Sequence, residues 1–111
     1  MGCVFCEIVA KKVPAKVVYE DDDLLVFPDI APAAPVHLLL IPKKHIVSIG
    51  EAREEDVLLL GKILIVAGKV AKLSKLTQGF RLVSNIGRDG GQTVFHLHVH
   101  LLGGRGMPWP P

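Results

Sequence analysis

Three histidines alternate with apolar residues near the carboxyl end of this 111-residue sequence, at His96, His98 and His100. Side chains of a β-strand point alternately to its two faces, so the three imidazoles share one face and the intervening apolar side chains share the other. The segment from Val94 to Leu102 is therefore predicted to be a strand with one face in the core. Three imidazoles in a row serve no packing purpose, so the other face indicates a functional site.

Four further segments have the composition of strands. Lys16 to Glu20 and Leu24 to Phe27 are short β-rich runs separated by three aspartates, which is typical of a hairpin. Val36 to Ile41 is an apolar run bounded by two prolines, typical of a central strand covered on both faces, and His37 is its one polar residue. Phe80 to Asn85 is the strand that precedes the histidine row.

Two helices complete the pattern. Cys3 to Lys11 is predicted to form a short helix that ends before Pro14. Glu51 to Lys75 is predicted to form a long helix, with acidic residues at its start and lysines at its end that complement the helix dipole. The long helix is apolar over most of its circumference, so we expect one side to cover the sheet and another to meet a second copy of the chain. The element order predicts an α+β fold, an antiparallel sheet of about five strands with these two helices.

Length and composition bound the class of protein. The sequence matches one compact domain, residues 1–111, and 50% of it is hydrophobic, which indicates either a dense core or a surface buried by a partner. Formal net charge is only +2, and no basic run is interleaved with aromatic residues, so nucleic-acid binding is not expected. No apolar stretch is long enough to span a membrane. The amino terminus does not have the pattern of a signal peptide, so we expect a cytoplasmic protein with reduced cysteines.

The histidine row is compatible with two chemistries. Imidazole is a nucleophile and an acid–base group near neutral pH, because its unperturbed pKa is about 6.5. Same-face positions lie about 6.6 to 6.8 Å apart along a strand, so a neighbouring histidine can assist the middle one without occupying its substrate position. Three histidines with an open fourth position also describe many catalytic zinc sites. Spacing alone leaves covalent catalysis and metal binding both open.

The glycine-rich segment before the row favours phosphate chemistry. Residues 87–93 read Gly-Arg-Asp-Gly-Gly-Gln-Thr, and glycine-rich backbone can turn its N–H groups toward an anion. Gln92 and Thr93 add side-chain donors beside them. A glycine-rich loop by itself is usually a hairpin turn, but this one leads directly into the histidine strand. Together the two features indicate a nucleophile next to a phosphate site.

The segment from Asn85 to Arg105, with its Gly-Gly-Gln-Thr-Val-Phe-His-Leu-His-Val-His-Leu-Leu-Gly-Gly-Arg run, resembles the histidine triad (HIT) family, and its Hint branch in particular. The similarity covers most of the chain, including Phe27 to Pro32, Ile41 to His45 and the closing Trp109 to Pro111. The resemblance implies a homodimer of α+β subunits joined into a continuous sheet. It also implies a hydrolase of purine nucleoside 5′-phosphoramidates that forms a covalent nucleotidyl-histidine intermediate and releases nucleoside monophosphate and an amine.

The resemblance also implies roles for individual residues. His98 is then the nucleophile, and His37 and His100 orient or tune it, with His96 as the remaining histidine of the row. Asp29 accepts the ribose hydroxyls, for which a carboxylate is well suited. The residues implied to hold the α-phosphate are Asn85, Gly91, Gln92, Thr93 and the backbone near Val94. The residues implied to form the apolar slot around the purine, which are otherwise ordinary core candidates, are Val4, Phe5, Ile8, Phe27 and Ile30.

Cys3 and Cys6 have the spacing of metal ligands, and a disulfide is not expected in a reducing compartment. Two ligands do not complete a site. Zinc-bearing proteins that resemble this chain use two such cysteines, the histidine after Pro-Lys-Lys, here His45, and the first histidine of the row, His96. Four protein ligands close the coordination shell and make the zinc structural. The alternative is a pair of unmetallated thiols in a short helix.

The sequence departs from the Hint pattern at two positions and leaves two other functions open. Thr93 stands where many Hint members have serine and keeps the hydroxyl, whereas Pro108 stands where some have histidine and leaves the contribution of the tail to specificity open. A dinucleoside polyphosphate hydrolase would use the same His98 chemistry with another leaving group. A nucleotide-binding scaffold would process neither substrate well. An apolar slot does not distinguish adenine from guanine.

Overall fold

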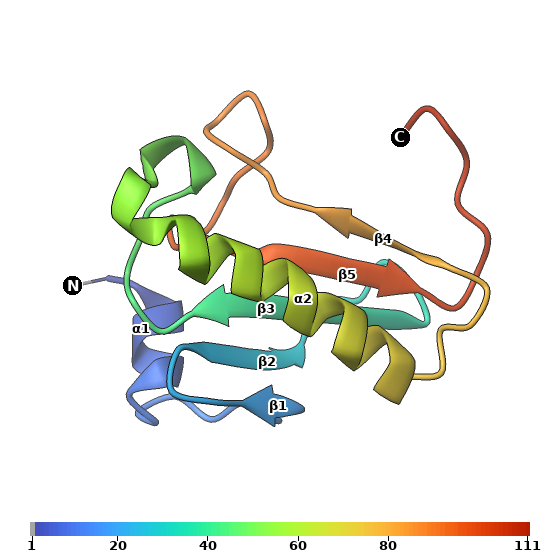
Figure 1. Ribbon diagram of the computed structural model, residues 1–111, viewed down its shortest axis with the longest axis horizontal. Helices are drawn as coiled ribbons and strands as arrows, with labels where there is room; N and C mark the ends of the chain where they lie inside the picture. The colour runs from blue at the N-terminus through green and yellow to red at the C-terminus, as the bar shows by residue number, and fades with distance from the viewer. Residues whose placement is uncertain (1) are drawn as a thin grey trace.

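The computed structural model describes residues 2–111 as one antiparallel sheet with a helix on each face (Figure 1). The strands are β1 (Tyr19–Glu20), β2 (Leu24–Pro28), β3 (Val36–Pro42), β4 (Phe80–Val83) and β5 (Val99–Gly103). Their order across the sheet is β1-β2-β3-β5-β4. The helices are α1 (Val4–Val9) and α2 (Val57–Leu73), and two 3-10 turns, Ile49–Glu51 and Glu54–Asp56, precede α2. The predicted α+β fold is confirmed.

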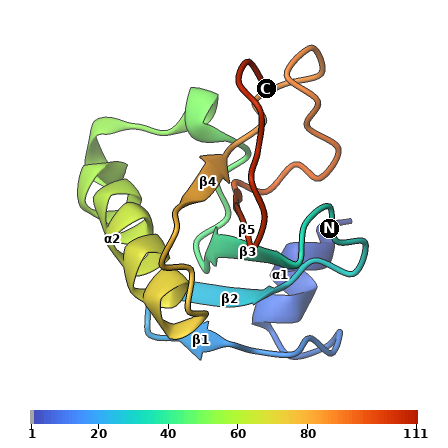
Figure 2. The same ribbon diagram turned by 90° about the vertical axis from the view of Figure 1, so that its right-hand side faces the viewer.

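Each face of the sheet has its own apolar core, because alternate residues of the central strands point to opposite sides. Figure 2 shows α2 on one side of the sheet and α1 on the other. The α2 side holds Leu24, Val26, Leu38 and Leu40 from β2 and β3, packed against Ile63, Val66, Ala67, Val70 and Ala71 of α2. The α1 side holds Leu25, Phe27, Leu39 and Ile41, packed against Phe5 and Ile8 of α1. Burial on both faces explains why β2 and β3 are apolar almost without interruption.

The histidine segment keeps the predicted alternation but forms a regular strand only from Val99, not from Val94. Leu97, Val99 and Leu101 lie in the core on the α2 side, so the histidines lie on the α1 side. Before Val99 the main chain leaves the sheet, and the Leu97 N–H donates to Ile46 O at 2.6 Å, in the segment that follows β3. The strand prediction was therefore correct in sidedness and too long at its start.

Other boundaries differ from the predictions where side chains bond to the main chain. The long helix begins at Val57 instead of Glu51, because Asp56 accepts from the Arg53 N–H at 2.9 Å and from Lys44 at 2.7 Å, which fixes a tight turn there. β1 is limited to two residues at an edge of the sheet, β4 ends at Val83, and α1 spans only six residues. No helix within residues 2–111 is long and apolar enough to cross a membrane.

Candidate active site and metal centre

The ring of His98 is buried and held in one tautomer. Its Nδ1 lies 2.8 Å from the carbonyl oxygen of His96, and a carbonyl only accepts, so Nδ1 carries a proton and, in the neutral ring, Nε2 has the lone pair. The ring contacts Phe5 edge-on, with centroids 5.2 Å apart, and lies 5.0 Å from the ring of His100. In the neutral ring Nε2 is therefore the nucleophilic nitrogen. The ring is held by the His96 carbonyl and by its contacts with Phe5 and His100.

His37 and His100 form a second, oriented pair. The sheet brings them together because β3 and β5 are neighbours, with Leu39 opposite His100. The Ala33 N–H donates to His37 Nδ1 at 2.9 Å, which places the His37 proton on Nε2, where it donates to His100 Nδ1 at 2.9 Å. The remaining proton of His100 is therefore on its Nε2. Asp29 stands beside the pair, with Oδ2 3.4 Å from His37 Nε2.

Burial lowers the pKa of His100 below the ordinary histidine value, and the nearby His98 and His37 lower it further, while the Asp29 carboxylate opposes them. The hydrogen-bonded pair of His37 and His100, here called the relay, requires a neutral His100, because only a neutral ring can accept the His37 N–H at Nδ1. The relay is therefore built for neutral imidazoles, as nucleophilic catalysis at histidine demands.

The glycine-rich loop is closed by side-chain amides. Gln92 accepts the Gly87 N–H at 2.9 Å and donates to Val47 O at 2.7 Å and Val94 O at 3.0 Å, so both its donor hydrogens are engaged within the protein. Asn85 donates to Gly90 O at 2.7 Å. These two side chains, predicted as phosphate contacts, shape the loop in this structure. Gly91, with a φ of +87°, and Thr93 are exposed along it.

The five residues predicted for the purine slot do not all come together. Phe5, Ile8 and Phe27 are buried in the core on the α1 side, and Phe5 meets Phe27 edge-on with ring centroids 5.6 Å apart. Val4 is 41% exposed and Ile30 is fully exposed. Phe5 joins this core to the active site, because the same ring packs on His98. Phe5, Ile8 and Phe27 therefore lie together in one apolar cluster, and the fully exposed Ile30 is not part of it.

Four potential metal ligands converge beside the row, with all their ligand atoms within 4.8 Å of one another. His96 Nδ1 lies 3.3 Å from Cys3 Sγ, 3.5 Å from Cys6 Sγ and 3.2 Å from His45 Nδ1. Cys6 Sγ lies 3.2 Å from His45 Nδ1. The predicted group of Cys3, Cys6, His45 and His96 is thus a possible metal-binding group.

The protonation of His96 shows that this group fits a metal ion. Its Nε2 lies 2.8 Å from Pro42 O, so Nε2 carries the proton and the Nδ1 lone pair faces the other three ligands. A tetrahedral ion with bonds of about 2.0 to 2.3 Å places its ligand atoms about 3.3 to 3.8 Å apart, close to the spacing observed. A carbonyl that fixes the far nitrogen of a ligating histidine is the usual outer partner in such sites.

Comparison with known proteins agrees with this geometry. Residues 2–107 match the family model described as "scavenger mRNA decapping enzyme C-term binding". A HIT-like protein of Synechococcus elongatus is 51% identical over 97% of this chain and 95% of its own length. The chain belongs to the histidine triad family. A HIT family hydrolase from Legionella pneumophila is similar in structure, with a TM-score of 0.97, 52% identity and 99% of each chain covered. A HIT family hydrolase from Clostridium thermocellum has a TM-score of 0.93 and 46% identity, over 96% of this chain and 94% of its own.

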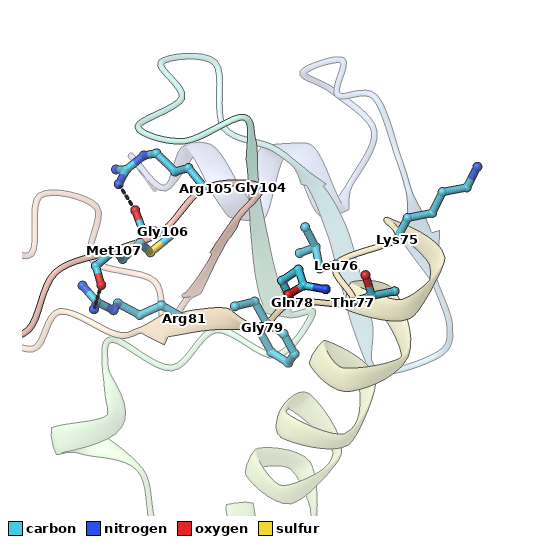
Figure 3. A pocket seen from close by; sticks show the side chains of 11 residues that line it. Lys75, Leu76, Thr77, Gln78, Gly79, Arg81, Gly104, Arg105, Gly106 and Met107 are labelled. Atoms are coloured by element: carbon cyan, nitrogen blue, oxygen red, sulfur yellow. Dashed lines mark hydrogen bonds between the residues drawn. The ribbon is translucent and has the colours of Figure 1, made fainter.

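A separate cavity of about 480 Å³ lies at the end of β5 away from the histidine triad, between residues 75–81 and 104–107 (Figure 3). Two arginines border it. Arg81 donates to Pro108 O at 2.8 Å, and Arg105 donates to Gly106 O at 3.0 Å and Ala33 O at 3.1 Å. Both guanidinium groups donate to main-chain carbonyls, and none of the residues that line this cavity belongs to the histidine row.

Two groups that hold the histidines of the site in place could not be recognised from the sequence. The Ala33 N–H fixes the tautomer of His37, and any residue except proline supplies such a donor. The Ser84 hydroxyl donates to the main-chain carbonyl of His98 at 2.8 Å. A serine at the end of a strand is an ordinary residue, and only the fold shows what it contacts.

Proposed function

We propose that this chain hydrolyses purine nucleoside 5′-phosphoramidates through a covalent intermediate on His98. The observation that carries the proposal is the tautomer of His98, whose Nδ1–H donates to the His96 carbonyl so that Nε2 is the nitrogen that can attack phosphorus. A ring fixed in this way begins the reaction as a nucleophile without first losing a proton. Membership of a family that includes HIT family hydrolases supports the same reaction class.

The reaction has two displacements at phosphorus. In the first, His98 Nε2 forms a bond to the α-phosphorus, and the P–N bond to the amine breaks with its electron pair passing to nitrogen, which takes up a proton as it leaves. In the second, a water oxygen bonds to phosphorus and releases one proton, which replaces the proton that the amine took up. The bond to His98 breaks with its electron pair returning to Nε2, which releases nucleoside monophosphate and restores the ring. We assign the free Nε2–H of His100 to the phosphate oxygens, because its tautomer makes it a donor beside His98.

The nucleotide lies along the loop and the α1 side of the sheet in this proposal. The backbone near Val94 and the Thr93 hydroxyl hold the α-phosphate. The Gly91 N–H donates to Arg88 O at 3.0 Å, so Gly91 serves with Asn85 and Gln92 to hold the loop in the shape that presents these groups. Asp29 accepts the ribose hydroxyls. Phe5 forms the floor of the purine slot, next to the nucleophile.

Turnover of adenosine 5′-phosphoramidate by the parent chain and by His98→Ala tests the proposal. We expect the variant to lose at least about a thousandfold in kcat, because no other group replaces a covalent nucleophile, while adenosine monophosphate still binds. Hydrolysis by His98→Ala at the parent rate would refute the mechanism. Preference of the parent for a diadenosine polyphosphate would change the substrate, and turnover of neither compound would favour a nucleotide-binding scaffold.

We propose that Cys3, Cys6, His45 and His96 bind one structural zinc ion. Two thiolates and two imidazoles close a tetrahedral shell. The ion would therefore connect α1 to the segment that follows β3 and to the segment that precedes β5, and it would leave no position for substrate. Protein purified without added zinc should contain close to one equivalent per chain, and chelation should lower the melting temperature. Cys6→Ser should lose the metal, whereas protein with only trace zinc would contradict this assignment.

We also propose a homodimer with a continuous sheet. β4 and β1 are the edge strands, and β1 has only two residues, so β4 is the edge that can pair with a second copy. The outer face of α2 adds an apolar surface, with Val57, Leu64 and Ile65 each more than half exposed. Gly61 and Gly68 of α2 have no side chain, and no atom lies within 4 Å of the place where a Cβ would be. A second helix can therefore approach that face closely.

A further inference from the structure

The ladder between β4 and β5 stops just before the nucleophile. Its last pair is Val83 with His100, and β5 begins at Val99. Beyond that pair the segments that continue β4 and β5 still lie near each other. Within residues 2–111, no main-chain N–H outside the strand ladders donates to the carbonyl of His98. The peptide of the nucleophile therefore lies where regular sheet bonding has ended.

A side chain takes over at this point. The Ser84 hydroxyl donates to His98 O at 2.8 Å, immediately after the last ladder pair on the β4 side. Ser84 is half-buried, and a buried or half-buried carbonyl without a donor costs free energy. The hydroxyl thus extends the connection between the two strands by one position, at the residue that carries the reacting nitrogen.

The same short segment leads into the glycine-rich loop. Asn85, the next residue, closes the loop through its bond to Gly90 O, and the loop returns to His98 through residues 92–97. Ser84 is therefore the point where the origin of the proposed phosphate loop is bonded directly to the main chain of the nucleophile. Without that bond, the nearest connection between the start of the loop and the His98 strand is the Val83–His100 pair of the ladder, two residues beyond His98.

We propose that Ser84 is a positioning residue, which fixes the separation between His98 and the phosphate loop. This inference rests on the proposed function for its substrate, but its structural part concerns the His98 peptide alone. A displacement of about 1 Å between nucleophile and substrate costs up to about a hundredfold in rate, so a single hydrogen bond at this point has leverage on catalysis. Ser84 touches neither substrate nor the reacting nitrogen, and it acts through the main chain of His98.

The experiment compares Ser84→Ala with Ser84→Thr, which restores a hydroxyl, and with Ser74→Ala, a half-buried serine at the end of α2. For adenosine 5′-phosphoramidate, Ser84→Ala should lower kcat about tenfold and leave KM nearly unchanged, because positioning is lost in the transition state and binding is not. Ser84→Thr should recover most of kcat. Ser74→Ala should keep the parent kcat.

Two further measurements separate positioning from stability and from the proposed function. Melting temperatures show whether each variant is folded under assay conditions, and a fall in kcat that follows the folded fraction would overturn the inference. Nitrogen NMR of the His98 ring should show a weakened Nδ1–H bond in Ser84→Ala only. If the parent hydrolyses no phosphoramidate, the proposed function fails, and the ring spectrum still tests Ser84: an unchanged His98 signal in Ser84→Ala would overturn its role.

Discussion

His96 connects two sites through three different atoms. Its main-chain carbonyl accepts the Nδ1 proton of His98, its Nε2 donates to Pro42 O, and its Nδ1 faces the sulfur and nitrogen ligands of the metal-binding group. The row of three histidines thus divides into a pair that serves the proposed reaction and one residue that serves the cluster. The division depends on which nitrogen is protonated in each ring. Main-chain carbonyls fix the tautomers of His96 and His98, and the side chain of His37 fixes that of His100.

The lowered pKa of His100 predicts how the rate of hydrolysis depends on pH. Protonation of His100 at Nδ1 would remove the acceptor for His37, so the rate should fall as pH falls through the pKa of His100, which burial holds below 6.5. Because the His100 pKa is lower in the folded state than in the unfolded chain, its contribution to folding stability is fully present above about pH 6.5. That contribution is lost as pH falls through the folded pKa. A pH–rate profile with NMR titration of His100 measures both.

Asp29→Asn is the matched variant for that titration. The Asp29 carboxylate raises the pKa of His100 against the effect of burial, so its neutral replacement should move the His100 titration to still lower pH. A His100 midpoint at or above the ordinary histidine value, or one that does not respond to Asp29→Asn, would show that the relay is not controlled in this way.

At the scale of elements, side chains that bond to the main chain decide where helices and strands end. Asp21 closes the β1–β2 hairpin by accepting from the N–H groups of Asp23 and Leu24, at 2.8 and 2.9 Å, and from the Tyr19 hydroxyl at 2.7 Å. Lys62 of α2 lies 3.1 Å from the same carboxylate, which ties the hairpin to the helix. Partial burial opposes ionisation of Asp21, but these donors outweigh it and hold its pKa well below the usual range.

Asp21→Ala should therefore lower the free energy of unfolding by about 1 to 3 kcal/mol, because it leaves several donors without their acceptor. The pKa of Asp21 is depressed, so its contribution is present above about pH 3.9 and is lost only as pH falls through the lower folded value. Urea unfolding at neutral pH and in acid measures both effects. Asp22→Ala, at the exposed neighbouring position, should change little, and equal losses in the two variants would contradict this account.

The outer surface of α2 is apolar and exposed, and it is the face on which we propose that the dimer forms. Its apolar side chains Val57, Leu64 and Ile65 lie opposite the face that covers the sheet. Exposed apolar surface of this extent on a helix is typical of an interface. The edge of β4 offers unpaired main-chain groups to the same partner.

Leu64→Lys should convert the proposed dimer to a monomer, because it places a charge in the centre of that face. Light scattering during size-exclusion chromatography measures the change in mass. Val17→Lys is the control, since Val17 is also exposed but precedes β1 at the opposite edge of the sheet. A parent chain that elutes as a monomer, or a Leu64→Lys variant that stays dimeric, would contradict the proposed interface.

The direction of the side chains in the histidine strand, and the chemistry that they carry, could be predicted from the sequence. Alternation placed Leu97, Val99 and Leu101 in the core and the three histidines on the other face, because the side-chain period of an extended chain depends only on local geometry. The spacing of Cys3 and Cys6 indicated metal ligands for the same local reason. The family resemblance supplied the remaining two ligands.

The start of β5, the bond that fixes the His96 ring and the hydrogen bonds of Gln92 could be known only from the folded chain. Each depends on a partner distant in sequence: Leu97 bonds to Ile46, His96 to Pro42, and Gln92 to Val47. Each of these contacts ends on a main-chain carbonyl, a group that every residue type has, so the partner leaves no pattern in the sequence. For the same physical reason Ser84 is recognisable as a partner of His98 only in the folded chain.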